Sequence, residues 1–157
     1  MAANTNPIYP VTPNIGLMNV LLSTAVTNTK AFDGTDAAGT ALALVFTAGT
    51  NGARVDTVKA KFTGSNGATA SGTTAANLVR FFLNNGSANT TATNNQFLGE
   101  IELPATAVTA LATAKQVEYT LALDISIPAG YKIYAGTTIA VGGTNCAVLV
   151  SAQGGDY

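Results

Sequence analysis

Few side chains in this sequence could do chemistry, and two of them flank Gly34-Thr35. Asp33 and Asp36 could together offer carboxylate oxygens to Ca²⁺. Calcium loops supply roughly six to eight oxygen ligands and a distal bidentate Glu, and the segment from Asp33 to Asp36 has neither. We therefore interpret residues 33–36 as a tight turn rather than as a metal site.

Glu100 and Glu102 form a second candidate pair, because residues two apart share one face of a strand. Paired carboxylates hydrolyse glycosides when the surroundings raise the pKa of one of them. Nothing nearby in the sequence would do so here. We expect both side chains on a solvated or partner-facing strand surface.

The single cysteine, Cys146, has no activating base, because the sequence contains no histidine. We expect it to be a small buried hydrophobic residue. One cysteine also excludes an internal disulfide and a thiolate metal cage. We therefore expect no catalytic residue, no metal site and no cofactor, and we expect that the protein is not an enzyme.

Arg80 lies in the most apolar segment, residues 77–84. A buried arginine needs a carboxylate partner, which Asp56 or Glu100 could supply. Contact with another subunit is the alternative.

Short β-strands must position these side chains. From Val117 to Ile127 every second residue is apolar, and Val58, Ala60 and Phe62 alternate with Lys59 and Lys61. This pattern, with turn residues between the apolar runs, predicts an all-β antiparallel sandwich, jelly-roll-like, as one domain over 17–157. Residues 64–76, 84–95 and 105–115 are expected to be loops, the last with at most one short turn. The expected strands are 20–27, 42–47, 54–63, 77–84, 96–103, 117–127, 131–135, 137–141 and 146–152.

Residues 1–16 are expected to form an extended arm, because Pro7, Pro10 and Pro13 disfavour helix. The anchors for a neighbouring molecule would be Ile8, Tyr9, Val11 and Ile15, since exposed apolar side chains on an extended segment indicate a contact surface. A disordered terminus is the alternative.

The composition restricts the partners. The 157 residues carry a formal net charge of −1, and only 10% are charged. So few basic residues argue against nucleic acid, and the longest apolar run, residues 41–46, is too short to span a membrane. No basic residue precedes the apolar stretch 15–26, so we expect no signal peptide and synthesis in a cytoplasm. A surface of Thr, Ser, Asn, Gly and Ala suits broad contact with protein, since charged residues are depleted at interface cores.

Six short segments follow one another in a recognisable order: 53–56, 79–86, 92–95, 102–106, 127–132 and 154–157. On the order of these segments, about two thirds of the chain, from Arg54 onward, resembles a group of small virion proteins of tailed bacteriophages. The architecture is similar to that of cement (decoration) proteins, small β-sandwiches that bind the outer surface of the capsid. The resemblance carries no residue-level functional motif.

This resemblance implies a virion protein on the outer capsid surface, made in the host cytoplasm. It would bind the major capsid protein and bridge its subunits, without nucleic acid or membrane as a partner. A homo-oligomer is expected, with a trimer preferred over a dimer. The alternative is a tail, baseplate or head-fibre component that contacts the host through loops 64–76 and 84–95, although these loops lack the aromatic residues that stack on sugars.

Overall fold

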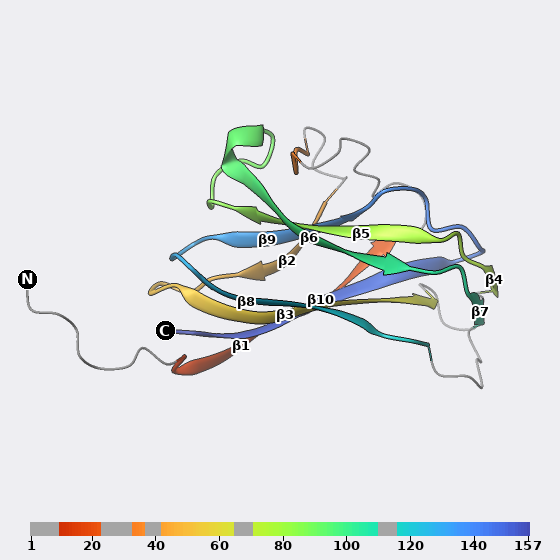
Figure 1. Cartoon of the computed structure of the whole chain (residues 1–157), viewed down its shortest axis with the longest axis horizontal. Coiled ribbons are helices and arrows are strands. Elements are labelled where there is room, and N and C mark those ends of the chain that lie inside the picture. The colour runs from red at the N-terminus through yellow and green to blue at the C-terminus, as the bar shows by residue number, and fades with distance from the viewer. Residues whose placement is uncertain (1–9, 23–32, 37–41, 65–70, 110–115) are drawn as a thin grey trace, which may run out of the picture.

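The computed structural model describes residues 10–22, 33–36, 42–64, 71–109 and 116–157, and Figure 1 shows them as strands in two layers. The expected all-β, antiparallel, sandwich-like fold is confirmed. A 3-10 turn, η2 (Ala92–Asn94), is the one helical element in these ranges. The strands are β1 (Thr12–Leu22), β2 (Ala43–Thr47), β3 (Ala53–Gly64), β4 (Ser71–Thr73), β5 (Asn77–Asn84), β6 (Asn95–Leu103), β7 (Ala107–Thr109), β8 (Tyr119–Ile127), β9 (Lys132–Thr137) and β10 (Cys146–Asp156).

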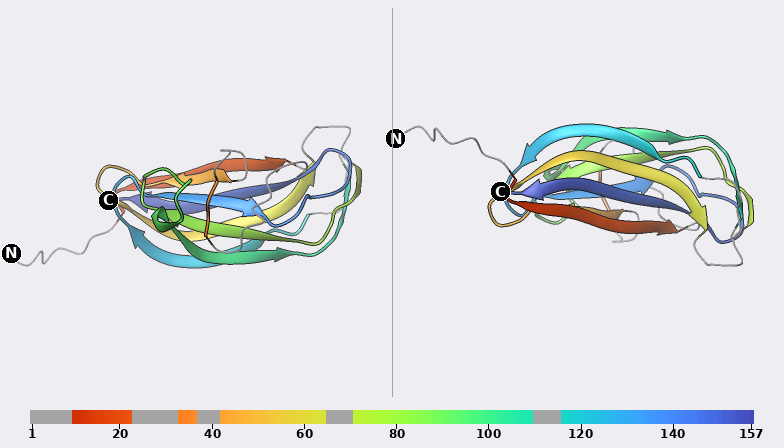
Figure 2. Two further views of the ribbon diagram at one scale, coloured as in Figure 1. Left: turned by 90° about the horizontal axis from the view of Figure 1, so that it is seen from above. Right: turned by 90° about the horizontal axis from the view of Figure 1, so that it is seen from below.

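Eight longer strands form the two main sheets, and β4 pairs with β7 in a small third sheet. The order is β1-β10-β3-β8 in one sheet, here called sheet A, and β2-β9-β5-β6 in the other, sheet B. Along the chain these eight strands pair from the ends inward: β1 with β10, β2 with β9, β3 with β8 and β5 with β6. Successive pairs alternate between the sheets. Figure 2 shows β1 and β2 along one side of the sandwich and β6 and β8 along the other.

The core lies between the sheets and follows the period of two in the sequence. In β3, Val58, Ala60 and Phe62 are buried, whereas Lys59 and Lys61 point outward, as their alternation predicts. In β5, Val79 and Phe81 are fully buried. In β8 the inward-facing residues from Tyr119 to Ile125 are only half-buried, since this strand lies at the edge of sheet A.

The structure differs from the expected elements at three places. Strand β1 begins at Thr12, inside the expected arm 1–16, and Thr12 to Gly16 pair with Asp156 to Ala152 of β10. Pro13 is compatible with this pairing because β1 is an edge strand, where the missing N–H of proline need not break the ladder. The expected strands 131–135 and 137–141 are replaced by the single strand β9, because Gly136 pairs with Arg80 and continues it, whereas residues 138–141 lie outside any strand.

The third difference concerns the segments expected as loops. Residues 71–73 and 107–109 form the short strands β4 and β7. Three-residue strands give no periodic signal, so the sequence did not reveal them.

No helix in the described ranges is long and apolar enough to cross a membrane.

Phe81→Ala tests the position of the core. Phe81 is fully buried in β5, so the substitution should lower the free energy of unfolding by about 3–5 kcal/mol. Ile139→Ala is the matched control, because Ile139 is 47% exposed, and it should cost less than about 1 kcal/mol. Urea denaturation of both variants measures the difference. Equal losses would contradict the assignment of Phe81 to the core.

Candidate partner-contact surface

The two aspartates around Gly34-Thr35 bind donors of their own chain. The backbone N and the Oγ1 of Thr35 each donate to Asp33 Oδ1 at 2.9 Å, and the backbone N of Leu42 donates to Asp36 Oδ2 at 3.0 Å. Gly34 occupies the left-handed region, with φ +64°, which glycine adopts without steric cost. Within the described ranges, no group of three or more His, Cys, Asp or Glu side chains could hold a metal ion.

The remaining chemical candidates are also accounted for by local contacts. Arg80 Nε lies 3.2 Å from Glu100 Oε2, across the β5–β6 ladder, so Glu100 rather than Asp56 is its carboxylate partner. The Arg80 side chain is 14% exposed, and it therefore finds its counter-charge within the chain. Glu100 and Glu102 are both exposed, as expected of a strand surface. Cys146 is fully buried, as predicted.

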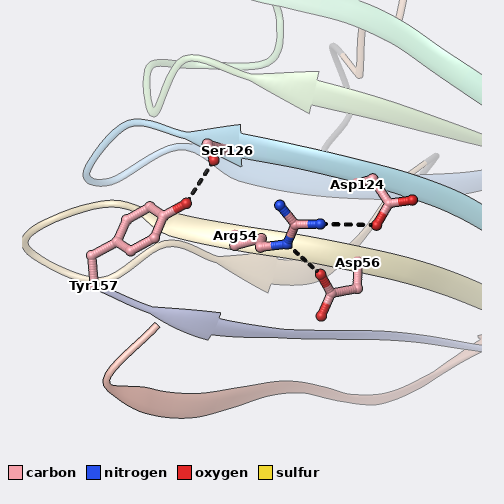
Figure 3. A network of polar contacts seen from close by, with 5 residues as sticks. All are labelled: Arg54, Asp56, Asp124, Ser126 and Tyr157. Atoms are coloured by element: carbon pink, nitrogen blue, oxygen red, sulfur yellow. Dashed lines mark hydrogen bonds and ion pairs between the residues drawn. The ribbon is translucent and has the colours of Figure 1, made fainter. Parts of the chain in front are cut away.

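The outer face of sheet A carries two groups of paired charges. At one end, Arg54 Nε lies 2.7 Å from Asp56 Oδ1 and Arg54 Nη2 lies 3.1 Å from Asp124 Oδ1, as Figure 3 shows. The hydrogen bond to Asp56, supported by the negative charges of both aspartates, raises the pKa of Arg54. Beside this group, the hydroxyls of Ser126 and Tyr157 lie 2.6 Å apart.

Arg54 also sits at an irregularity of the edge strand β8. Val55 pairs with Ile125 and Thr57 with Ala122, so Asp56 alone faces Leu123 and Asp124. Asp124 has φ +49°, which aspartate tolerates better than most residues. This is a β-bulge, and Arg54 links Asp56 opposite the bulge to Asp124 within it.

The net charge of a second charged group balances that of the group around Arg54. Lys59 and Lys61 lie 3.2 and 3.8 Å from the carboxylate of Glu118. With Arg54, Asp56 and Asp124, the two groups hold three cations and three anions, so their net charge is zero. Exposed pairs of this kind add little stability. Their consequence is a sheet face whose charges sum to zero, with small neutral residues such as Thr120 and Ala122 between them.

An apolar strip borders this face at the start of β1. Val11 is 81% and Ile15 is 62% exposed, and Pro13 between them is exposed too. Asn14 points the other way, because its Nδ2 donates to Thr47 O of sheet B at 3.1 Å and to Asp156 Oδ1 at 2.9 Å. Side chains alternate along a strand, so Val11, Pro13 and Ile15 face away from sheet B. We call these three residues the β1 strip.

The β1 strip contains two of the four anchors expected from the sequence. Val11 and Ile15 lie on it, and the structure brings them together on one side of an edge strand. Ile8 and Tyr9 lie outside the described residues. Sequence reasoning missed Pro13 as a member of the strip and missed the charge pairs of Arg54. Arg54 and Asp56 lie two residues apart in an alternating segment, and this spacing is the signal that could have revealed the charge pairs.

Asparagine side chains shape the loop between β5 and β6. Asn84 Nδ2 donates to Asn95 Oδ1 at 2.8 Å, and the backbone N of Gly86 donates to Asn84 Oδ1 at 2.9 Å. Asn95 Nδ2 in turn donates to the carbonyl oxygens of Asn89 and Thr91. The exposed, uncharged tip of the loop is therefore held by side-chain amides in one conformation.

No protein-family model matches the sequence, and no curated protein matches it either. The candidate contact surface is therefore defined by its own geometry: a sheet face whose charges sum to zero and, beside it, the exposed apolar β1 strip.

Tyr134 gives a test of the packing on the outer side of sheet B. Burial, and secondarily the negative charge of Asp36, raise the pKa of Tyr134 above 10.0. A raised pKa means that its contribution to stability is complete below about pH 10 and is lost as the pH rises through the folded-state value. Tyr134→Phe should therefore show a smaller fall in the free energy of unfolding than the wild type between about pH 8 and about pH 11. Urea titrations at both pH values measure this, and equal falls would contradict the burial of the phenol.

Proposed function

We propose that this protein is a virion structural protein, a capsid cement (decoration) protein of a tailed bacteriophage. It binds the outer surface of the phage head and bridges neighbouring major capsid protein subunits. The observation that carries the proposal is the exposed β1 strip beside a sheet face whose charges sum to zero. The resemblance of the chain from Arg54 onward to small phage virion proteins supports it.

We further infer that the eight longer strands form a jelly roll. The inward pairing of strands, with successive pairs alternating between the sheets, is the arrangement of a long hairpin folded over into a sandwich. Jelly rolls are frequent among viral capsid domains, so the inference agrees with a role in a virion. Because one fold can host many functions, the jelly roll alone does not determine the role of the protein, and the surface carries the proposal.

The β1 strip suits a cement role because of where it lies. Exposed apolar residues on an edge strand release water on contact, and a neutral face beside them opposes no partner by charge. A standard interface buries roughly 800 Å² per partner, and many such contacts on one shell add to a large stabilisation. A homotrimer, or else a homodimer, would place several strips on adjacent shell subunits.

A tail, baseplate or head-fibre component is the second candidate. The loop held by asparagine side chains favours it, since an ordered, uncharged tip with Asn and Thr groups suits sugar hydroxyls. Loop tip residues 85–93 contain no aromatic residue to stack on a sugar ring, which is why this candidate ranks second.

Copy number separates the two candidates. A shell-covering protein is expected at a copy number of the same order as the major capsid protein, whereas a tail or fibre component is expected at a small fraction of it. Quantitative mass spectrometry of purified particles measures the ratio. Absence of the chain from the particles would contradict both roles.

Ile15→Asp tests the β1 strip directly. A charge at the centre of an apolar contact should weaken binding to undecorated heads roughly tenfold or more, since a central anchor contributes at least about 1.4 kcal/mol. Ile139→Asp is the matched control, because it is the same change at another exposed isoleucine. Co-sedimentation with heads measures both affinities. If Ile15→Asp binds as well as Ile139→Asp, the β1 strip is not the contact.

A further inference from the structure

A groove opens on the other side of the sandwich, between the edge strands β6 and β8. Its cavity of about 480 Å³ is lined by three consecutive residues of each strand and by Pro104. Side chains of consecutive strand residues point alternately inward and outward. A cavity that touches three consecutive residues must therefore follow the backbone edge of the strand. The six strand residues are Glu100, Ile101, Glu102, Tyr119, Thr120 and Leu121.

Both walls of the groove offer free backbone edges. Strand β6 pairs only with β5, and β8 only with β3, among the strands of the two main sheets. Alternate backbone N–H and C=O groups of each strand therefore face the groove. A second cavity, of about 320 Å³, continues it past Pro104 and Tyr119 as far as Val117, which is 60% exposed.

The β8 wall is also incompletely covered. Its inward-facing residues Tyr119 and Leu121 are half-buried, whereas the corresponding residues of the neighbouring strand, Val58 and Ala60, are buried. A Cβ on Gly99 of β6 would lie 2.8 Å from Leu121 Cδ2, so the two edges meet there and close one end of the groove. An added strand beyond this point would cover the exposed half of the apolar row.

The charge of the groove favours one kind of occupant. Glu100 and Glu102 line it, and none of the residues lining the two cavities is basic. Glu100 is paired with Arg80, whereas Glu102 takes part in no ion pair within the described ranges. Residues 1–14 of this chain contain no Lys or Arg, so this segment of a second copy could not supply a cation to pair with Glu102.

We propose that the groove between β6 and β8 binds a short extended segment of a partner protein. The segment pairs its backbone with β8 and places a Lys or Arg beside Glu102. The groove ends where Gly99 meets Leu121, and the bulge at Leu123–Asp124 interrupts the edge beyond it, so the pairing is limited to Tyr119–Leu121. Pairing at a sheet edge supplies affinity through the backbone, and the side chains of alternate residues supply specificity. This inference does not depend on the proposed role at the phage head.

Selection of peptides on the purified full-length protein tests the inference. The probe is a displayed library of random peptides of about seven residues, which at roughly 3.3 Å per residue is long enough to cover the regular part of β8. We expect enrichment of sequences with alternating apolar residues and at least one Lys or Arg. In an NMR titration, an enriched peptide should shift the amide signals of residues 100–102 and 119–121. No enrichment, or shifts confined to another surface, would overturn the proposal.

Two matched changes then test the contacts. Glu102→Gln should weaken binding of the enriched peptide about threefold to tenfold, because one charge-assisted contact is lost. Gln153→Lys makes the same change in net charge on the exposed outer face of sheet A and should leave the affinity unchanged. Equal effects of the two substitutions would overturn the role of Glu102.

A change in the peptide tests the backbone pairing without altering the fold of the protein. N-methylation at alternate peptide positions removes the donors that face β8, and for one of the two sets it should weaken binding about fivefold or more. Insensitivity of both sets to N-methylation would overturn pairing with the strand edge. Calorimetry or fluorescence anisotropy measures all of these affinities.

Discussion

The antiparallel ladder between β3 and β10 is the interaction on which the rest of the structure depends. Residues 53–64 pair with 146–156, at the middle of sheet A, and β1 and β8 attach to the two sides of this pair. The ladder also requires glycine, because a Cβ on Gly154 would collide with the carbonyl oxygen of Arg54 at the register shift after Gln153. Such distant pairing makes loop closure costly before the ladder forms, so folding of this topology is expected to be slow relative to a fold of local contacts.

The two faces of sheet A differ in their side chains. Inward, Val55, Val58 and Val150 contribute apolar area to the common core. Outward, the group around Arg54 has a net charge of −1 and the group around Glu118 a net charge of +1, so the charges of this face sum to zero. The two edges of the sandwich differ as well: the β1 side presents exposed apolar residues, and the β8 side presents a groove with an acidic rim. One small domain thus offers two chemically distinct surfaces for contact.

The sequence predicts strands well where apolar residues are frequent and polar residues mark the ends. The strand 77–84 is confirmed at both ends, and the inward and outward residues of β3 are confirmed too. The nested pairing could not be predicted, because period and turns fix where strands are but not which distant strand each one meets. Three prolines predict that residues 1–16 stay outside the sheet, whereas Thr12–Gly16 pair with β10, because an edge strand tolerates proline. The half-burial of β8 depends on its place at an edge, which only the strand order determines.

The ladder between β1 and β10 is interrupted between Gly16 and Asn19, and this divides it mechanically. Its outer section, Thr12 to Gly16 against Asp156 to Ala152, carries Ile15, and its inner section begins at Asn19 opposite Val150. A pull on the β1 strip away from the sheet would load the hydrogen bonds of the outer section in succession, like opening a zipper. A pull along the strand would load them together. The outer section can therefore detach while Asn19–Leu22 stays paired. A force perpendicular to the strand would then separate the β1 strip from the sheet before the sandwich unfolds.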